Sequence, residues 1–219
     1  RTNKKKLLEQ AKAAWCEAFG MEVPSDEALK QEQADVAANK HVEQTSWIEQ
    51  LDTPDGIENW NQHGFTTLKE LSPFHDFDLS GKQLDGLDLG GFELNDCSFK
   101  GSSLVKADLA FGTYRRIDFS KANLSQASTK CSDFEECDFS AARLSEVTFH
   151  SAHLRGAKFN KVDLRGVRFV DCDLCGAAFV GTKHLATEPE AWKGSTYDET
   201  TLFPKGFVVP ASLKWGGKQ

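Results

Sequence analysis

Residues 157–179 read AKFNK, VDLRG, VRFVD, CDLCG and AAF, and the third residue of each group of five is Leu or Phe. Counting in fives from Phe74 to Phe179 gives 22 such positions without an insertion, and 20 of them are Leu or Phe. A helix of 3.6 residues per turn and a strand of period two cannot hold a five-residue apolar register over this length. The register therefore indicates a repeat.

A second class of residue lies two positions before each of these centres. From Cys97 to Ala177, 13 of the 17 such positions hold Ala, Cys, Ser, Gly or Thr. The other three positions of each unit are mostly polar. Each unit is therefore expected to bury one large and one small side chain and then to turn the chain through polar residues.

The centres repeat every twenty residues, which indicates four units per turn. One column is all Leu: Leu84, Leu104, Leu124, Leu144 and Leu164. Another is all Phe: Phe99, Phe119, Phe139, Phe159 and Phe179. We predict a mainly β fold, a square coil of about five and a half turns in which backbone hydrogen bonds join turns roughly 4.8 Å apart.

Three segments carry a family resemblance: Lys106-Ala107-Asp108-Leu109, the segment at 121–125 (KANLS), and the segment at 162–166 (VDLRG). They resemble the A(D/N)LXX signature of the pentapeptide-repeat proteins. The resemblance covers about half of the chain and implies a right-handed quadrilateral β-helix. The early units depart from the signature, with large residues at the small positions: Phe77, Lys82, Leu87 and Phe92. The first turn is therefore expected to be wider, or packed against what precedes it.

Residues 1–70 are predicted to be helical. A first helix with an apolar stripe from Leu7 to Phe19 ends at Gly20. A second begins with Ser25 as N-cap and runs to about Val42. A short third contains Trp47, Ile48 and Leu51, and a fourth begins at Thr53-Pro54 and includes Ile57 and Trp60.

The segment at 56–61 (GIENWN) resembles one that often precedes bacterial pentapeptide arrays. A helix there is expected to cover the first turn and to pack against Phe77, Leu87 and Phe92. Residues 183–219 bring back Trp and Pro, which are absent between 74 and 188, and are expected to cap the other end. The predicted domains are therefore a helical region at 1–70, a repeat coil at 71–182 and a cap at 183–219.

Composition excludes several function classes. The 219 residues carry 33 acidic and 26 basic side chains, a net charge of −7, which disfavours direct nucleic-acid binding. No apolar run approaches the ~20 residues that cross a bilayer, so we expect no membrane partner and a cytoplasmic location. Delivery as a bacterial effector is an alternative. Because the chain begins at Arg1, fusion to an upstream domain is another.

The sequence holds no recognisable catalytic, metal or cofactor motif. Cys172-x-x-Cys175 is half of a zinc site at most, and the register points Cys172 inward and Cys175 outward. His150 and His153 both point outward beside one corner. We therefore expect no catalytic, metal or cofactor residues, and a protein that is not an enzyme.

Charge divides the coil. Residues 74–139 carry twelve acidic and seven basic side chains, and residues 140–182 carry four acidic and six basic ones. Two interpretations of this charge difference stay open: an ordinary solvated surface without a binding role, and a polarised surface that docks a partner. For the second reading the candidate contacts are two outward apolar residues, Phe111 and Val170, and two charged groups. The acidic group is Asp133, Glu135, Glu136 and Asp138; the basic group is Arg155, Lys158, Lys161, Arg165 and Arg168.

The favoured function is a non-enzymatic scaffold that presents a rigid surface to a protein partner. The alternative is inhibition or protection of a DNA topoisomerase (gyrase) by mimicry of duplex DNA, which resemblance to the quinolone-resistance members of the family implies. The basic second half of the coil argues against a DNA mimic, and so does the absence of a recognisable C-terminal dimerisation helix. Enzyme activity within residues 1–70 is a third reading. The identity of the partner and the oligomeric state stay open.

Overall fold

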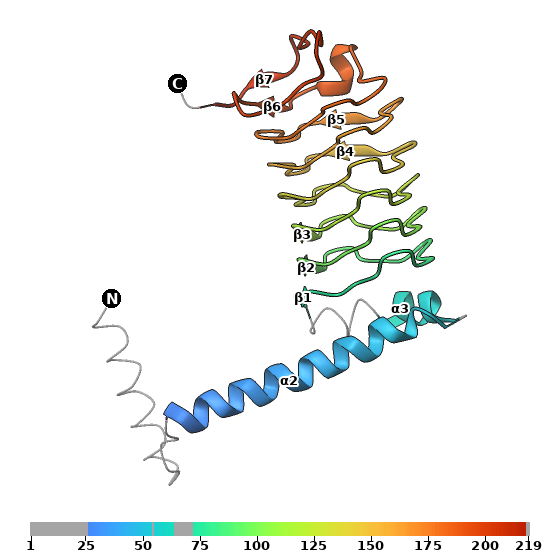
Figure 1. The fold of residues 1–219 in the computed structure, drawn as a ribbon, viewed down its shortest axis with the longest axis vertical. Helices are drawn as coiled ribbons and strands as arrows, with labels where there is room; N and C mark the ends of the chain where they lie inside the picture. The colour runs from blue at the N-terminus through green and yellow to red at the C-terminus, as the bar shows by residue number, and fades with distance from the viewer. Residues whose placement is uncertain (1–25, 54, 64–71, 218–219) are drawn as a thin grey trace. The chain divides into compact units, whose positions relative to one another are not determined.

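The structure is a computed structural model that describes residues 26–53, 55–63 and 72–217 (Figure 1). The chain divides into two compact units, Arg1–Thr45 and Ser46–Gln219. The predicted helix from Leu7 to Phe19 lies outside the described residues, as does the N-cap Ser25. The second unit holds the repeats.

Helix α2 spans Asp26–Gln50, so the predicted end near Val42 and the separate third helix are wrong. No Gly or Pro interrupts the chain between these points, and Thr45 donates its hydroxyl to the carbonyl of His41 one turn earlier. The helix ends where Thr53 donates its hydroxyl to the carbonyl of Gln50. Helix α3 then spans Gly56–His63, as expected.

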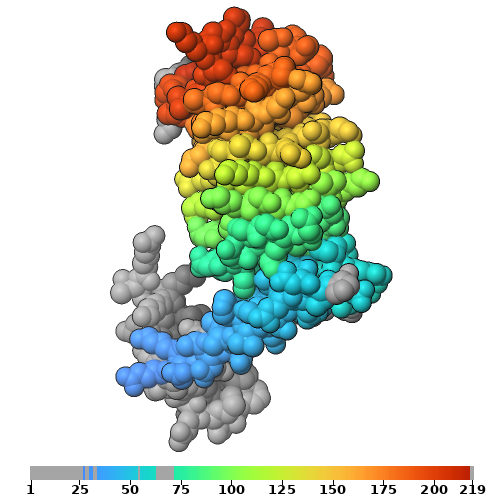
Figure 2. All heavy atoms as spheres, turned by 45° about the vertical axis from the view of Figure 1, so that its right-hand side comes forward, coloured from blue at the N-terminus to red at the C-terminus, as the bar shows by residue number. Residues whose placement is uncertain are grey.

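The coil is built from parallel pairs of residues twenty positions apart. Strand β1 (Phe74–His75) pairs with β2 (Glu93–Asn95), and β2 pairs with β3 (Thr113–Arg115). Strand β4 (Thr148–His150) pairs with β5 (Arg168–Val170). Between them run single parallel bridges such as Asp118 to Asp138 and Asn123 to Arg143. The turns stack as closely packed layers (Figures 1 and 2).

The predicted centres form the core. Phe99, Leu104 and Leu109 are fully buried, and the small residues two positions earlier are buried with them. In the Phe column the rings of Phe119, Phe139 and Phe159 stack at centroid spacings of 5.2 Å, with interplanar angles of 9° and 7°. One repeat thus contributes one large and one small side chain, as the sequence indicates.

A left-handed residue lies two positions after every centre. All 22 such residues, from Asp76 to Gly181, have positive φ, and only eight of them are Gly. Most donate their N–H to a carbonyl of the next turn, as Lys121 does to Ser140 at 2.9 Å. At many corners the carbonyl of the centre also accepts from the residue three positions on, as in a type II turn.

The acidic residues just before the centres hold the turns together. Asp118, for example, accepts a hydrogen bond from the backbone N–H of Ser120, at 2.8 Å. The same contact is made by Asp78, Asp88, Asp108, Asp133, Asp138, Asp163 and Asp173. This side-chain to backbone bond explains why Asp or Asn stands before the centre in the A(D/N)LXX signature.

The two centres that are neither Leu nor Phe both satisfy their hydroxyl groups. Tyr114 is fully buried and donates to the carbonyl of Leu89 at 2.6 Å, and Thr129 donates to the carbonyl of Thr148 at 3.1 Å. The Tyr114 hydroxyl takes the space of a small side chain in its own unit, since a Cβ on Gly112 would lie 2.2 Å from it. The pair Gly112 and Tyr114 therefore replaces the usual small and large residues.

Helix α3 closes the first turn. Its Trp60 is buried, lies 5.7 Å from the ring of Phe92 and donates its indole N–H to the carbonyl of Asp88. Asn61 donates to the carbonyl of Gly86 and accepts from the N–H of Asp88. The expectation of a helix packed against the enlarged residues of the first turn is confirmed.

The tail continues the core columns. It contains the 3-10 helix η2 (Pro189–Trp192) and the paired strands β6 (Thr196–Tyr197) and β7 (Lys214–Trp215). Trp192 stacks on Phe169 at 5.1 Å, and Phe203 stacks on Phe179 at 5.7 Å. The tail also covers Cys175, whose side chain points away from the coil core, as the register predicts, and is nevertheless only 5% exposed.

We predict that Gly112→Ala destabilises the protein by roughly 2 kcal/mol or more, because the new methyl group overlaps the Tyr114 ring. Urea unfolding measures the loss. In the double variant Gly112→Ala/Tyr114→Leu the loss is expected to be smaller than the sum of the two single losses. Additive losses would contradict the steric coupling.

Asp198 in the tail is expected to link stability to acid pH. Burial alone would raise its pKa, but hydrogen bonds from Thr200, Gly176 and Thr201 outweigh burial and lower the pKa to about 2. An unfolded Asp has a pKa of about 3.9, so this contribution is present above about pH 4 and is lost as the pH falls toward 2.

We therefore expect Asp198→Asn to lower the urea midpoint at pH 7 and to flatten its decline between pH 4 and pH 2. The neighbouring exposed Glu199, changed to Gln, is the matched control. An unchanged acid profile for Asp198→Asn would contradict this assignment.

Candidate functional site

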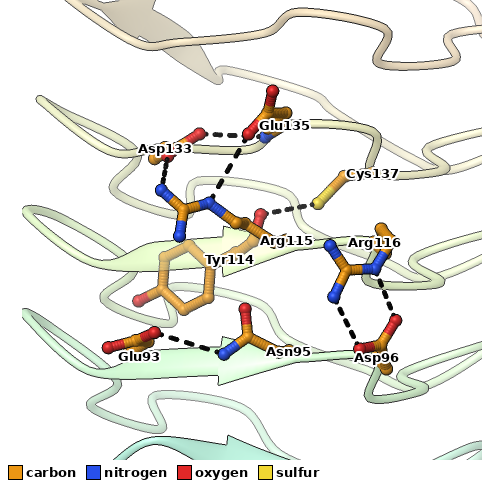
Figure 3. A network of polar contacts seen from close by, with 9 residues as sticks. All are labelled: Glu93, Asn95, Asp96, Tyr114, Arg115, Arg116, Asp133, Glu135 and Cys137. Carbon is orange, nitrogen blue, oxygen red and sulfur yellow. Dashed lines mark hydrogen bonds and ion pairs between the residues drawn. The ribbon is translucent and has the colours of Figure 1, made fainter. Parts of the chain in front are cut away.

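One face of the coil carries a network of charged residues, which we call the charged face. It consists of the outward side chains within 93–96, 113–116, 133–136 and 153–155, each set one turn beyond the last. Figure 3 shows residues of the first three sets. Arg116 contacts both carboxylate oxygens of Asp96, at 2.6 and 2.7 Å. Arg115 donates to Asp133 at 3.1 Å and lies 3.5 Å from Glu135.

These ion pairs shift the ionisation of their members. The hydrogen bond from Arg116 lowers the pKa of Asp96, and the same bond raises the pKa of Arg116. Both groups therefore stay charged at neutral pH. Because all of these side chains are partly exposed, each pair adds little stability, and its main effect is to hold the side chains in fixed positions.

Three of the four residues of the predicted acidic group have partners within the protein. Asp133 accepts from the N–H of Glu135 and from Arg115, and Asp138 accepts from the N–H of Ser140. Glu135 lies beside Arg115. Within the described part of the chain the side-chain carboxylate of Glu136 makes no hydrogen bond or ion pair, so it is the acidic candidate that is available to a partner.

Glu136 lies at a corner hollow of about 430 Å³, beside the charged face. The hollow contains both charge signs, with the carboxylates in the majority. Its lining residues are Arg116, Ile117, Asp118, Glu136, Asp138, Gly156 and Lys158. We call this the acidic corner.

The predicted basic group is dispersed over the coil. Arg155 is on the charged face and pairs with Asp173 at 2.9 Å. Lys158 stands one turn beyond Asp138 and lines the acidic corner, and Lys161 is exposed at the next corner. Arg165 and Arg168 lie in the two units that follow Lys161, beside another hollow. The structure therefore does not gather these five residues into one patch.

The two apolar candidates share one side of the coil but are separated. Phe111 is 66% exposed, whereas Val170 is half-buried in β5. In the turns between them Lys130 and His150 occupy the position of Val170, and Cys131 and Ser151 occupy that of Phe111. A continuous apolar patch is therefore absent from this side.

The described residues contain no group of three His, Cys, Asp or Glu side chains placed to hold a metal ion. The inward thiols are chemically quiet: burial raises the pKa of Cys97 to about 11 and that of Cys172 to about 12. None of the described helices is long and apolar enough to cross a membrane. The charged face and the acidic corner, which are the candidate functional features described above, both lie on the surface of the coil.

Residues 114–179 match a family model described as a pentapeptide repeat region. This part of the coil is a pentapeptide-repeat region. The match lies within the register read from the sequence, between Tyr114 and Phe179. No curated protein matches the chain.

Solved pentapeptide-repeat structures are similar to this array at low identity. A trypsin-treated form of QnrB1, a plasmid-mediated fluoroquinolone resistance protein, is 18% identical over 66% of this chain and 80% of its own, with a TM-score of 0.35. Rfr23 of the cyanobacterium Cyanothece 51142 is 17% identical over 59% of this chain and 86% of its own, with a TM-score of 0.30. Similarity at these scores does not indicate what this array binds.

The sequence did not single out Asp96, Arg115 and Arg116 of the charged face or Asp118 of the acidic corner. Twenty-residue spacing was the signal that could have found them, because Asp96, Arg116 and Glu136 occupy the same position in successive turns of the array. Spacing places them in one line. It does not show which of them bond to each other.

We predict that Asp133 and Glu136 respond differently to replacement by Ala. Asp133→Ala removes bonds to the Glu135 N–H and to Arg115, so we expect a loss of about 1 to 2 kcal/mol. Glu136→Ala is expected to change stability by less than about 0.5 kcal/mol, since Ala already occupies the same backbone position at Ala141. Urea unfolding compares them, and equal losses would contradict the division into occupied and free acids.

Proposed function

We propose that this protein is a non-enzymatic scaffold that binds a protein partner through the acidic corner of its pentapeptide-repeat array. The observation that carries the proposal is the free charge there. Most carboxylates of the array bond to their own chain, but the side-chain charges of Glu136 and Lys158 line a hollow of about 430 Å³ and make no hydrogen bond or ion pair among the described residues. Such groups are available to pair with a partner's charges.

The array suits binding by contact because its surface is rigid. Buried columns of Leu and Phe fix each unit, and backbone bonds between turns fix the corners. A side chain on such a corner loses little backbone freedom on binding, so less of the interaction energy is lost to ordering. The fixed Arg116 beside Glu136 adds a second pre-placed charge.

The finer features of the scaffold rest on the family resemblance and on composition. We propose a right-handed coil of about five and a half turns, from 22 units at four per turn. We also propose a cytoplasmic location, which is an expectation from the sequence alone. The proposed partner is a protein and not a nucleic acid.

Mimicry of duplex DNA toward gyrase is the less supported alternative. A DNA mimic needs carboxylates free along its length, whereas eight Asp residues of the array bond to their own backbone. The second half of the coil is also basic. A supercoiling assay in which the protein at micromolar excess leaves gyrase unaffected would exclude this alternative.

The proposal predicts that charge reversal at the acidic corner removes a partner. Crosslinked capture with the full chain should retain at least one protein that is lost from Glu136→Lys and from Lys158→Glu. Lys121→Glu is the matched control, because Lys121 occupies an equivalent exposed position outside the hollow. The control should retain the same protein.

Unfolding measurements on all three variants separate lost binding from lost structure. The proposal fails if no protein is retained by the wild type. It also fails if the corner variants and Lys121→Glu retain the same set.

A further inference from the structure

The twenty-residue register breaks in the last turn. Asp163 pairs with Lys183, twenty residues on, but Asp173 pairs with Thr196, twenty-three residues on. Three extra residues therefore lie between 183 and 196, where the chain swings outward through η2. Insertions in repeat arrays are often placed at binding faces because they alter the surface without disturbing the core.

This excursion creates a hollow of about 530 Å³ against the coil. Its floor is apolar, formed by the buried Val167 and Ala191 with the half-buried Leu185 and Ala186. The coil side carries Arg165 and Arg168. The outer rim carries Glu188 and Glu190.

The positive charges of Arg165 and Arg168 are only partly neutralised by neighbouring carboxylates. Arg165 lies 3.2 Å and 3.4 Å from the ring nitrogens of His184 and 3.8 Å from Asp163. Asp163 is already used, since it accepts from the N–H of Arg165 and contacts His184 at 2.9 Å. Arg168 reaches only the backbone carbonyl of Glu190, at 3.5 Å. In the described chain no carboxylate pairs with Arg168.

A second, smaller hollow of about 210 Å³ adjoins the first at Arg165. It is lined by Ala142, Arg143, Leu144, Ser145, Asp163 and Arg165. Arg165 thus borders both hollows, which follow one another over successive turns of the coil. We call the two hollows together the arginine groove. The arginine groove lies two units along the chain from the acidic corner. Because four units make one turn, the two sites are at opposite corners of the coil.

We propose that the arginine groove binds an extended acidic peptide segment of a protein partner. Two carboxylates of the segment pair with Arg165 and Arg168, and an apolar side chain between them rests on Val167 and Ala191. Guanidinium groups bind carboxylates through paired hydrogen bonds, and partial burial strengthens these contacts. The inference does not depend on the acidic corner, and the two sites can fail separately.

The shape and charge of the groove favour a peptide over other anions. Sites for small molecules enclose most of their ligand, whereas this groove is open and runs across two turns. Glu188 and Glu190 on the rim repel a continuous phosphate backbone. A short peptide can place its carboxylates on the coil side and avoid the rim.

Fluorescence anisotropy with the full chain tests the inference. The probe is a fluorescein-labelled peptide in which two Glu flank one Leu; the comparison probes are the same peptide with Gln for Glu, and a labelled single-stranded DNA. We expect the Glu peptide to bind at least about tenfold more tightly than the Gln peptide, a difference of about 1.4 kcal/mol. Its affinity should fall as salt is raised.

Variants assign the binding to the groove. Arg165→Gln/Arg168→Gln should weaken the Glu peptide about tenfold, and Thr187→Trp, which fills the hollow from an exposed position, should do the same without changing charge. Arg155→Gln, an exposed arginine outside the groove, should leave the affinity unchanged. Equal affinity for the Gln peptide, unchanged binding by the two groove variants, or no binding of the Glu peptide would overturn the inference. Tighter binding of the DNA than of the Glu peptide would also overturn the inference, because it would indicate a nucleic acid as the ligand of the groove.

Discussion

The structure depends on a left-handed residue in every repeat. A positive φ two positions after each centre turns the chain, and the N–H at that point bonds to the next turn. Fourteen of these 22 residues are not Gly, and each costs on the order of 1 kcal/mol in backbone strain. The bonds between turns and the burial of one large side chain per unit offset that cost. Neither the bonds between turns nor the burial of one side chain is sufficient alone, so each unit is stable only when its neighbouring units are folded.

This constraint explains how much of the fold the sequence could predict. The inward residues follow from the five-residue register because burial selects Leu, Phe and small side chains. The left-handed residues do not, since Lys121, Gln126 and Ala141 carry no compositional mark of positive φ. The length of α2 was misjudged because helix ends without Gly or Pro leave no local signal. The burial of Cys175 could not be predicted because the register describes the turns of the coil and not the tail that covers this residue.

The same constraint organises the functional surface. Asp residues before the centres serve the turns, so an acidic composition overstates the charge that a partner can meet. Two opposite corners present charge beside a hollow: a mixed, mainly acidic corner at Glu136, and a basic one at Arg165 and Arg168. The sequence could mark these residues as charged, but which of them pair internally depends on side-chain geometry between turns. The insertion that forms the arginine groove becomes evident only when the register is followed into the tail.

Amide hydrogen exchange tests the central claim most directly. The N–H groups of Lys121 and Glu136 bond to carbonyls of the next turn, whereas those of the preceding Ser120 and Glu135 bond only to an Asp side chain. Although all four residues are on the surface, the account predicts that Lys121 and Glu136 exchange slowly, near the limit for global unfolding, and that Ser120 and Glu135 exchange faster. Equally fast exchange at all four amides would contradict a coil held together at its left-handed corners.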